Sequence, residues 1–474
     1  MKLISTLILL LMIRVAAFAQ CDCGPVGDLL NGTRDTVGSV DGLRAAIAGA
    51  NGPTAIYLRD GEYALTGAVT ISRPGIIIRS LSGNRGGVVI TGIALSPDSA
   101  AFRVTEGNFT LADLTVRGMA SSAVVIDPGH PISNLLLHNV DFQDAGTTLV
   151  RADGTALADA GNGIVECCRF GYSASKSRNQ PVYGIRVNGG TNWSITNSVF
   201  EDIASASEPV PVSTAIVVTG GAGNIQISRN RITGCDLGMF VGDSTSFTTF
   251  VENVIVGNNF ITGGFGDGGG MLFAAAQGVT IQHNSVYRPG TPKTGAITIR
   301  YPQSFGVSLY DNLTDNPTVL IDVIGVLSSG NYDHITATSF VDVTKGDLHL
   351  RAGSPAIDIG SQQASSDIDC APVTDGRPDV GADEFVKPAS VDGDEDASPL
   401  QCSYSGAERL IRVHARGGVE VTAEMIDITG RIVFHGACRG DAVLPVPGIA
   451  PGAYILVVRG ARGEMAGRKI IVGR

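Results

Sequence analysis

The chain has few charged and few aromatic side chains. Charged residues make up 17% of its 474 residues and aromatic residues 6%, with one tryptophan, Trp193. Acidic residues outnumber basic ones, 45 against 34, so the formal net charge is -11. Binding to a nucleic-acid backbone needs a basic surface, which excludes nucleic acid as the main partner. A strongly anionic substrate would bind only where Arg and Lys gather locally.

Glycine, in contrast, is abundant. The chain has 62 glycines in 474 residues, about twice the usual share of ~7%. Together with the scarcity of aromatic residues, this favours small β-branched side chains stacked in layers that are joined by tight turns. The hydrophobic content of 43% is sufficient for a large core, so a wholly disordered chain is excluded.

The first 19 residues have the pattern of a secretory signal peptide. Lys2 precedes an apolar run over 3–13, and Ala17-Phe18-Ala19 has the small-x-small pattern of a cleavage site. The run is too short to span a bilayer comfortably, and no second apolar stretch of ~18 residues follows it. We therefore expect residues 1–19 to be removed on export and the protein to have no transmembrane segment.

Export makes the cysteines candidates for disulfide bonds. The chain has 8 cysteines, which allow about 105 pairings, so sequence alone cannot choose among them. We favour Cys402–Cys438, since both residues lie in one small C-terminal unit. Metal binding by Cys21 and Cys23, or by the adjacent Cys167 and Cys168, is disfavoured because neither pair matches the ligand sets of a zinc site.

A short pattern recurs through the middle of the chain: an alternating apolar run, then Asn or a substitute, then an apolar or aromatic residue. The Asn position returns at a mean interval of about 28 residues, which is typical of strands stacked as the coils of a solenoid. Around Asn197 we predict three strands, over 184–188, 193–196 and 198–200. The positions of the repeat are Asp113, Asn139, Cys167, Asn197, Asn230, Asn259, Asn284 and Asn312.

An asparagine at each of these positions suits a sharp bend. Its side chain bonds the local backbone and tolerates left-handed φ, and stacked asparagines bond to one another along a ladder. We expect the six asparagines of the repeat to lie in a single file along one corner of the solenoid.

These repeats, over about residues 28–385, resemble the right-handed parallel β-helix proteins of the pectate-lyase-like superfamily. The apolar spacing over 43–50 predicts a helix that Asn51-Gly52-Pro53 ends. In this family an amphipathic N-terminal helix plugs the open end of the coil. The resemblance implies an all-β fold over residues 20–386, a right-handed parallel β-helix with an N-terminal capping helix.

Two segments at the far end of the solenoid, 353–360 and 375–385, are similar to a closing segment of exported β-helix proteins, the choice-of-anchor type. Their aspartates are compatible with a calcium site, since oxygen-rich loops suit Ca²⁺, but turn and capping roles are favoured. We therefore expect no cofactor and no metal.

The C-terminal part has a different character. Residues 387–402 include two prolines and four acids, as in a solvated linker, and residues 403–474 alternate as in a small β-sandwich. Asp427-x-x-Gly430-Arg431, Pro451–Tyr454 and Arg468–Val472 resemble the C-terminal sorting domain of the type IX secretion system, although its usual Asn-Pro start is missing. The resemblance implies transfer by that machinery to the medium or the outer surface of a Gram-negative bacterium.

Many proteins of the pectate-lyase-like superfamily cleave acidic polysaccharides by β-elimination. The reaction needs a cation beside the substrate carboxylate, a base for the α-proton and an acid for the leaving oxygen. Alternation along the strands predicts that Arg186, Asn188 and Arg300 point outward. We predict substrate-binding roles for these three residues and for Arg288 and Tyr301.

The loops that precede these strands contain three further basic residues, Lys176, Arg178 and Lys293, which are the candidate catalytic residues. Exposed Arg and Lys on turns are also common as solvated spacers, so two hypotheses stay open. The protein is either a polysaccharide lyase or a non-catalytic polysaccharide-binding surface protein or adhesin. A polygalacturonase-like hydrolase is disfavoured because Gly-His-Gly and Arg-x-Lys motifs are absent. We expect a monomer.

Overall fold

The computed structural model divides the chain into two compact units, Met1–Phe385 and Val386–Arg474. The predicted signal peptide and most of the predicted linker lie outside the described residues. None of the helices that the structure describes is long and apolar enough to cross a membrane. The described residues are 21, 23–27, 32–92, 99–127, 132–154, 160–173, 180–205, 212–243, 249–263, 269–289, 295–361, 366–373, 377–386, 400–405, 410–415, 420–427, 431–446, 449, 452–460 and 465–472.

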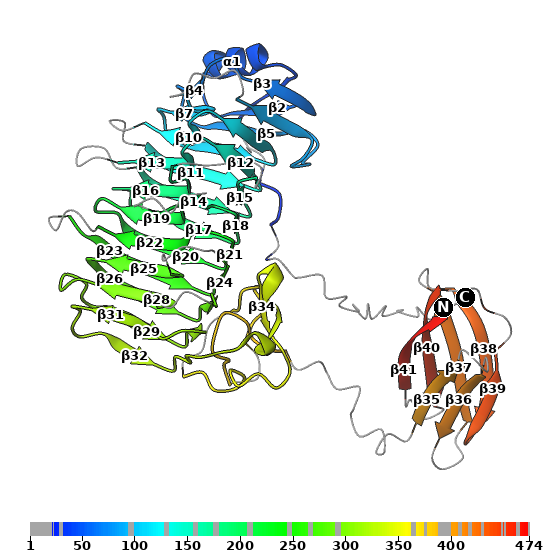
Figure 1. Cartoon of the computed structure of the whole chain (residues 1–474). Coiled ribbons are helices and arrows are strands. Elements are labelled where there is room, and N and C mark those ends of the chain that lie inside the picture. The colour runs from blue at the N-terminus through cyan, green and yellow to red at the C-terminus, as the bar shows by residue number, and fades with distance from the viewer. Residues whose placement is uncertain are drawn as a thin grey trace, which may run out of the picture. The chain divides into compact units, whose positions relative to one another are not determined.

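The first unit winds into three long parallel sheets (Figure 1). The first sheet comprises β1 (Thr33–Val37), β2 (Thr54–Leu58), β5 (Ile76–Ser80), β8 (Phe109–Ala112), β11 (Ile132–His138), β14 (Ala160–Glu166), β17 (Ser194–Thr196), β20 (Gly223–Ser228), β23 (Val251–Gly257), β26 (Ala276–Gln282), β29 (Ser308–Tyr310) and β32 (Leu327–Ser329). The second sheet comprises β4 (Val69–Ile71), β7 (Phe102–Val104), β10 (Ser122–Ile126), β13 (Thr148–Asp153), β16 (Tyr183–Asn188), β19 (Thr214–Thr219), β22 (Leu237–Gly242), β25 (Met271–Ala274), β28 (Ile297–Arg300) and β31 (Val319–Ile321). The third sheet comprises β3 (Gly61–Ala64), β6 (Val88–Thr91), β9 (Thr115–Met119), β12 (Asp141–Ala145), β15 (Arg169–Gly171), β18 (Val199–Glu201), β21 (Arg231–Thr233), β24 (Phe260–Thr262), β27 (Ser285–Tyr287) and β30 (Leu313–Thr314).

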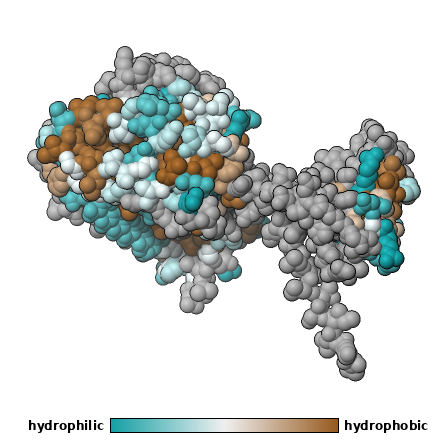
Figure 2. All heavy atoms as spheres, turned by 90° about the horizontal axis from the view of Figure 1, so that it is seen from below, coloured by the Kyte–Doolittle hydropathy of each residue, from teal (hydrophilic) through white to brown (hydrophobic). Residues whose placement is uncertain are grey.

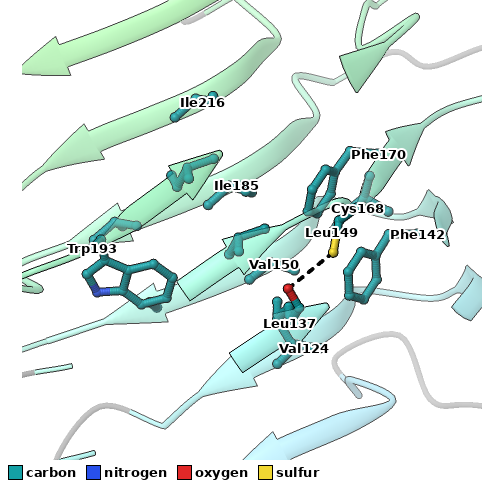
Figure 3. Packing of buried hydrophobic residues seen from close by; sticks show 14 of the residues in the cluster. Val124, Leu137, Phe142, Leu149, Val150, Cys168, Phe170, Ile185, Trp193 and Ile216 are labelled. Atoms are coloured by element: carbon teal, nitrogen blue, oxygen red, sulfur yellow. Dashed lines mark hydrogen bonds between the residues drawn. The ribbon is translucent and has the colours of Figure 1, made fainter. Parts of the chain in front are cut away.

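Apart from the two ends of the solenoid, each coil contributes one strand to each sheet, so the predicted parallel β-helix with three strands per coil is confirmed. Alternate side chains of every strand point inward and stack on those of the neighbouring coils. Phe142, Phe170 and Phe200 form one such stack, with ring centroids 5.1 and 4.7 Å apart. Figure 3 shows Phe142 and Phe170 of this stack together with Cys168, whose thiol donates to the carbonyl of Leu137 at 3.4 Å.

The predicted helix covers the N-terminal end of the coil (Figure 1). It is α1 (Val40–Gly49), and the side chain of Ser39 caps it by accepting from the N–H of Gly42 at 3.1 Å. Leu43 and Ile47 are buried in the main core. An uncovered solenoid end would expose apolar side chains and unpaired strands, which this helix prevents.

The asparagine repeat forms two adjacent columns, so the expectation of a single file is wrong. The next residues along the chain after Asn139 and Asn197 are Val140 and Ser198. The pairing of neighbouring strands places Val140 and Ser198, and not the two asparagines, in register with Asn230. Asn139 and Asn197 have left-handed φ of 52°, as do the residues in register with them, Arg229, Asn258, His283 and Asp311, with φ of 50–57°. Asparagine therefore serves two purposes here, a left-handed bend in one column and an inward amide in the next.

The inner column is a continuous ladder of buried amides. The Nδ2 of Asn230 donates to Asn259 Oδ1 at 3.1 Å, that of Asn259 to Asn284 at 2.9 Å, and that of Asn284 to Asn312 at 2.9 Å. Asn331 extends the ladder by accepting from Asn312 at 2.8 Å. Buried polar groups are tolerated only when they are bonded, and this stack satisfies each amide along the coil axis.

Residues 21 and 23–27 form a strap at the N-terminus, which is fixed to the coil by two disulfides, Cys21–Cys370 and Cys23–Cys167. Cys167 belongs to the column of residues with left-handed φ, so the strap lies along that column. Further along the strap, the Val26 carbonyl accepts from Arg79 Nη1 at 2.8 Å. The predicted Cys402–Cys438 bond is wrong: the two cysteines lie on β35 and β38, which belong to different sheets of the C-terminal unit, and form no disulfide in the described structure.

The described residues of 337–385 lie against the outer side of the third sheet (Figure 1, yellow). They include most of the two stretches predicted to close the solenoid and are called the closing segment from here on. It contains η1 (Ala337–Ser339), β33 (Phe340–Asp342), η2 (Val343–Lys345) and β34 (Asp347–Leu350). The carboxylate of Asp379 accepts from the N–H of Asp358 at 2.7 Å and of Phe385 at 2.6 Å. Asp383 accepts from Leu350 N–H at 2.7 Å. Asp379 and Asp383 thus accept from backbone N–H groups, as turn and capping residues do, whereas Asp375 lies outside the described residues.

The last coil leaves an apolar surface open. Leu320, Ile324 and Leu327 are 48%, 78% and 62% exposed on and beside β31 and β32, the edge strands of their sheets. Figure 2 views the molecule from this end and shows apolar patches on it. Unlike the N-terminal end, this end is not covered by a helix of the described chain.

The second unit consists of two antiparallel sheets around a small core of its own. One sheet contains β35 (Leu400–Ser405), β36 (Leu410–Ala415) and β39 (Ala442–Pro445), and the other β38 (Ile432–Arg439), β37 (Glu420–Asp427), β40 (Gly452–Gly460) and β41 (Met465–Val472). Asp427 closes the turn between β37 and β38, because its N–H donates to the Arg431 carbonyl at 2.9 Å and its carboxylate pairs with Arg431 Nε at 3.2 Å. This part of the predicted sorting motif therefore has a structural role.

Candidate functional site

The outward face of the second sheet carries a row of arginines. Arg103, Val125, Arg151 and Arg186 occupy the same register position on four successive coils. Neighbouring strands of a sheet are about 4.8 Å apart, so Arg151 and Arg186 are direct neighbours. We call Arg103, Arg151 and Arg186 the arginine row.

Two members of the arginine row are neutralised by aspartates. Arg103 Nη1 lies 3.2 Å from Asp127 Oδ2, and Arg151 Nε lies 2.8 Å from Asp153 Oδ2. Arg186 is half-buried and forms no hydrogen bond or ion pair with the described residues. Its guanidinium is thus the member of the row that remains available for an external anion.

Two polar residues flank Arg186 on β16. Asn188 takes the outward position two residues on, and its Oδ1 accepts from Thr219 Oγ1 at 3.3 Å. Burial raises the pKa of the Tyr183 hydroxyl, and the positive charge of Arg186 opposes that rise. Both groups keep hydrogen-bonding capacity next to the guanidinium.

Arg300 lies on the same face but does not meet Arg186. Four strand steps separate β28 from β16, about 19 Å at the usual strand spacing. In register, the row from Arg186 runs through Val217, Phe240 and Leu272 to Thr298, and Arg300 lies two residues beyond Thr298 on β28. The predicted binding residues therefore form two polar patches on either side of an apolar stretch.

The second patch contains unsatisfied polar atoms. Within the described chain, Thr298 Oγ1 and Arg300 Nε are buried and have no hydrogen-bond partner. Buried donors without partners are costly and rare in native proteins. Tyr301 follows with a left-handed φ of 76°, and its N–H donates to the Ile321 carbonyl at 2.9 Å. Thr298 is only 3% exposed, whereas Arg300 is half-buried, so Arg300 is the residue of this patch that an anionic group can reach.

Arg288 is not on the open face, contrary to the role we predicted for it. Its side chain is only 2% exposed, and Nη2 donates to the Asp236 carbonyl at 3.0 Å. Burial lowers the pKa of this guanidinium, and the nearby Cys235 and Asp236 oppose the shift. The residue ties the loop to the preceding coils, and a polymer on the sheet face does not reach it.

The three candidate catalytic residues, Lys176, Arg178 and Lys293, lie outside the described residues, so their roles remain predictions. Sequence reasoning also missed Arg103 and Arg151. Each lies between two inward apolar residues, the signal that identified Arg186, and the register then places them in the same row.

Among the described residues, His349, Asp369 and Asp383 are close enough together to hold a metal ion. Both imidazole nitrogens are already engaged, Nδ1 with Asp347 and Nε2 with Asp369 at 2.8 Å. Arg231 Nη2 also pairs with Asp369 at 2.9 Å. These contacts form an ion network that joins the closing segment to the third sheet, and a metal would have to displace them.

The network predicts a loss of stability at alkaline pH. Burial disfavours the charged imidazole, but the bonds to Asp347 and Asp369 outweigh it and raise the pKa of His349 to about 9. A histidine with a raised folded-state pKa stabilises fully below its unfolded pKa of about 6.5, and loses that contribution as pH rises through the folded value. Burial also raises the pKa of Asp383 to about 7, but the contribution of this carboxyl declines between its unfolded pKa of about 3.9 and pH 7, below the alkaline range in which His349 loses its charge.

We expect the thermal midpoint of the wild-type β-helix unit to fall between pH 7 and pH 10 more steeply than that of His349→Gln, whose side chain does not titrate there. Differential scanning calorimetry across this range measures both slopes. His435→Gln, in the C-terminal unit, is the matched control and keeps the wild-type slope. Parallel curves for wild type and His349→Gln would exclude a charged His349 in the network.

Comparison with known proteins agrees with the architecture. A family model described as "Right handed beta helix region" matches residues 122–316, and no curated protein matches the chain. Pectate lyase Pel9A is similar in structure, with a TM-score of 0.48, 16% identity, and coverage of 75% of this chain and 97% of that chain. The alginate lyase from Paenibacillus sp. str. FPU-7 has a TM-score of 0.36, 15% identity, and coverage of 64% and 95%. PfbA, a surface adhesin of Streptococcus pneumoniae, has a TM-score of 0.38, 13% identity, and coverage of 66% and 90%.

Proposed function

We propose that the protein is a secreted or surface-attached, carbohydrate-active β-helix protein that binds acidic polysaccharide on the second sheet and cleaves it by β-elimination. The observation that carries the proposal is Arg186, a half-buried guanidinium without a partner in the described structure, on the outward face of a chain with net charge -11. A planar guanidinium pairs with a carboxylate through two hydrogen bonds, which matches a uronic acid.

The reaction divides among several groups. Arg186 neutralises the carboxylate, so that the proton α to it becomes more acidic and the negative charge that develops is stabilised. Arg300, which is half-buried on the same face, holds a sugar further along the polymer. Lys176, Arg178 and Lys293 are the candidate bases for the α-proton. The electrons of that C–H bond form the carbon–carbon double bond as the bond to the glycosidic oxygen breaks, and the leaving oxygen takes its proton from the protonated base or from water. A base in this position needs a pKa lowered by burial or by neighbouring cations.

A non-catalytic polysaccharide-binding protein or adhesin is the second candidate. One observation favours it: aspartates pair with Arg103 and Arg151, so only one member of the arginine row has its full charge available. Such a surface suits weak, repeated contacts along a polymer. The two candidates differ in whether the bound chain is cut.

Export is part of the proposal. The signal-peptide pattern and two disulfides suit an oxidising compartment outside the cytoplasm. Residues 403–474 carry the features of a type IX sorting domain, and we propose that they direct the protein to the medium or to the outer surface of a Gram-negative bacterium. Unchanged export after deletion of residues 403–474 would exclude that role.

We expect the mature protein to produce unsaturated oligosaccharides from polygalacturonate, alginate or a glycosaminoglycan, detected by ultraviolet absorbance. Arg186→Ala is expected to reduce the rate about 100-fold or more, because one charge-stabilising group typically contributes that much. Arg103→Ala is the matched control: Asp127 already neutralises it, so most of the activity is retained.

The same samples distinguish the candidates. If no product forms but affinity electrophoresis shows retention by an acidic polysaccharide that Arg186→Ala abolishes, the protein is a binder. If folded protein neither cleaves nor is retained by these polymers, the proposed function is wrong.

A further inference from the structure

A second surface, on a different face of the coil, has the features of a binding site. A groove of about 850 Å³ runs over the outward side of the first sheet, which is within the range of ligand sites. It extends from Pro53 and Pro74 at one end to Asn192 and Ser194 at the other. Strands β2 to β17 form its floor, so it follows the coil axis as a polymer would.

One side of the groove is a row of exposed asparagines. Asn108, Asn134, Asn162 and Asn192 occupy the same position on successive coils, all with left-handed φ between 55° and 63°. The Nδ2 of Asn134 donates to Asn108 Oδ1 at 2.8 Å, and that of Asn192 to Asn162 Oδ1 at 3.1 Å. An amide has two donors and two acceptor lone pairs, so these two contacts within the row leave each amide with further hydrogen-bonding capacity for a ligand.

The other side of the groove is aliphatic. Ile77, Leu136 and Ile164 lie in one outward register position, together with Thr110. Ile164 is 43% exposed, although it is a large apolar side chain in the middle of a sheet. The groove thus repeats an amide and an apolar or hydroxyl group once per coil, about every 4.8 Å.

The groove's chemistry limits its occupant. None of its lining residues is charged, so it offers no compensation for a charged polymer. The backbone of its strands is fully engaged between neighbouring coils, which excludes the addition of a peptide strand. A pyranose chain has hydroxyl edges, apolar C–H faces and a repeat close to one coil.

We propose that this groove binds a neutral polysaccharide, with the asparagine row bonding hydroxyl groups and the aliphatic row covering the apolar sugar faces. The site is separate from the arginine row, which lies on the second sheet. It therefore goes beyond the proposed action on acidic polysaccharide and does not depend on it.

Isothermal titration of the mature protein with cellohexaose, xylohexaose and chitohexaose tests the proposal. We expect at least one of the three to bind, and Ile164→Asp to weaken that binding about tenfold or more, through loss of apolar contact. Ile255→Asp is the matched control, because Ile255 holds the same outward register on β23, is 48% exposed, and lies outside the groove. It is expected to retain wild-type affinity.

The proposal is overturned if none of the three sugars binds, or if Ile164→Asp and Ile255→Asp bind equally well. It is also overturned if phosphatidylcholine vesicles, and no sugar, are retained by wild type but not by Ile164→Asp, because the groove would then bind lipid. Ile164→Asp is expected to leave the response to polygalacturonate and alginate unchanged, so failure here is distinguishable from failure of the proposed function.

Discussion

The Cys21→Ser/Cys370→Ser variant is expected to lose on the order of 4 kcal/mol of unfolding free energy relative to wild type. The bond joins residues 349 positions apart, so it ties the N-terminal strap to the closing segment across nearly the whole unit. In the chain-entropy account, a cross-link over a long loop restricts the unfolded chain strongly and therefore favours the folded state. The strap also lies over the left-handed column, which its release would expose.

Urea denaturation of the β-helix unit without reductant measures the effect. Cys438→Ser is the matched control, since this cysteine lies in the C-terminal unit and forms no disulfide in the described structure. Dithiothreitol should shift the wild-type midpoint toward that of the double variant. Equal midpoints for wild type and double variant under oxidising conditions would contradict the structural importance of the bond.

Asn259→Ala is expected to cost roughly 4 kcal/mol of stability or more. Asn259 is fully buried, and its Oδ1 accepts from Asn230 N–H at 2.9 Å and Nδ2 at 3.1 Å. Its Nδ2 donates to Asn284 Oδ1 at 2.9 Å and to the Ile227 carbonyl at 3.1 Å. Alanine removes these four hydrogen bonds, each with a net contribution of about 1 kcal/mol. It also leaves the Asn230 N–H buried without its acceptor, whereas Asn230 Nδ2 keeps the Ile195 carbonyl and Asn284 Oδ1 keeps the N–H of residue 259.

Asn224→Ala is the matched control on the exposed row at the opposite corner. Asn224 bonds Asn192 at 3.1 Å but is exposed, so water replaces the lost bond. Its φ of 54° adds a backbone penalty for alanine, about 1–2 kcal/mol. Urea midpoints of the two variants give the comparison. A smaller loss for Asn259→Ala than for Asn224→Ala would show that the ladder does not stabilise the coil.

The register of the asparagine repeat shows where sequence reasoning stopped. Asn197 and Asn230 look alike in sequence, because each follows an alternating run and precedes a short strand. One lies in the left-handed bend and the other, one position later in register, points inward. The bend position and the ladder position both hold asparagine in a similar sequence context, so only the pairing of neighbouring coils distinguishes them.

The candidate site shows the same limit. Alternation was sufficient to place Arg186 and Arg300 outward, because the period of a strand is local. It did not show that the two residues lie four strands apart, or that Asp127 and Asp153 neutralise their neighbours in the row. Arg288 lies in a stretch whose sequence is typical of a surface loop, yet its side chain is buried.

By itself, the sequence determined the parallel β-helix, the three strands of each coil and the capping helix, because these follow from short-range apolar periodicity repeated at a constant interval. Tertiary structure decided which cysteines pair, which asparagines face inward, which arginines carry an available charge, and that a neutral groove lies on another face. Those features depend on contacts between residues 25 to 349 positions apart, whose distances in space are set by how the coils stack.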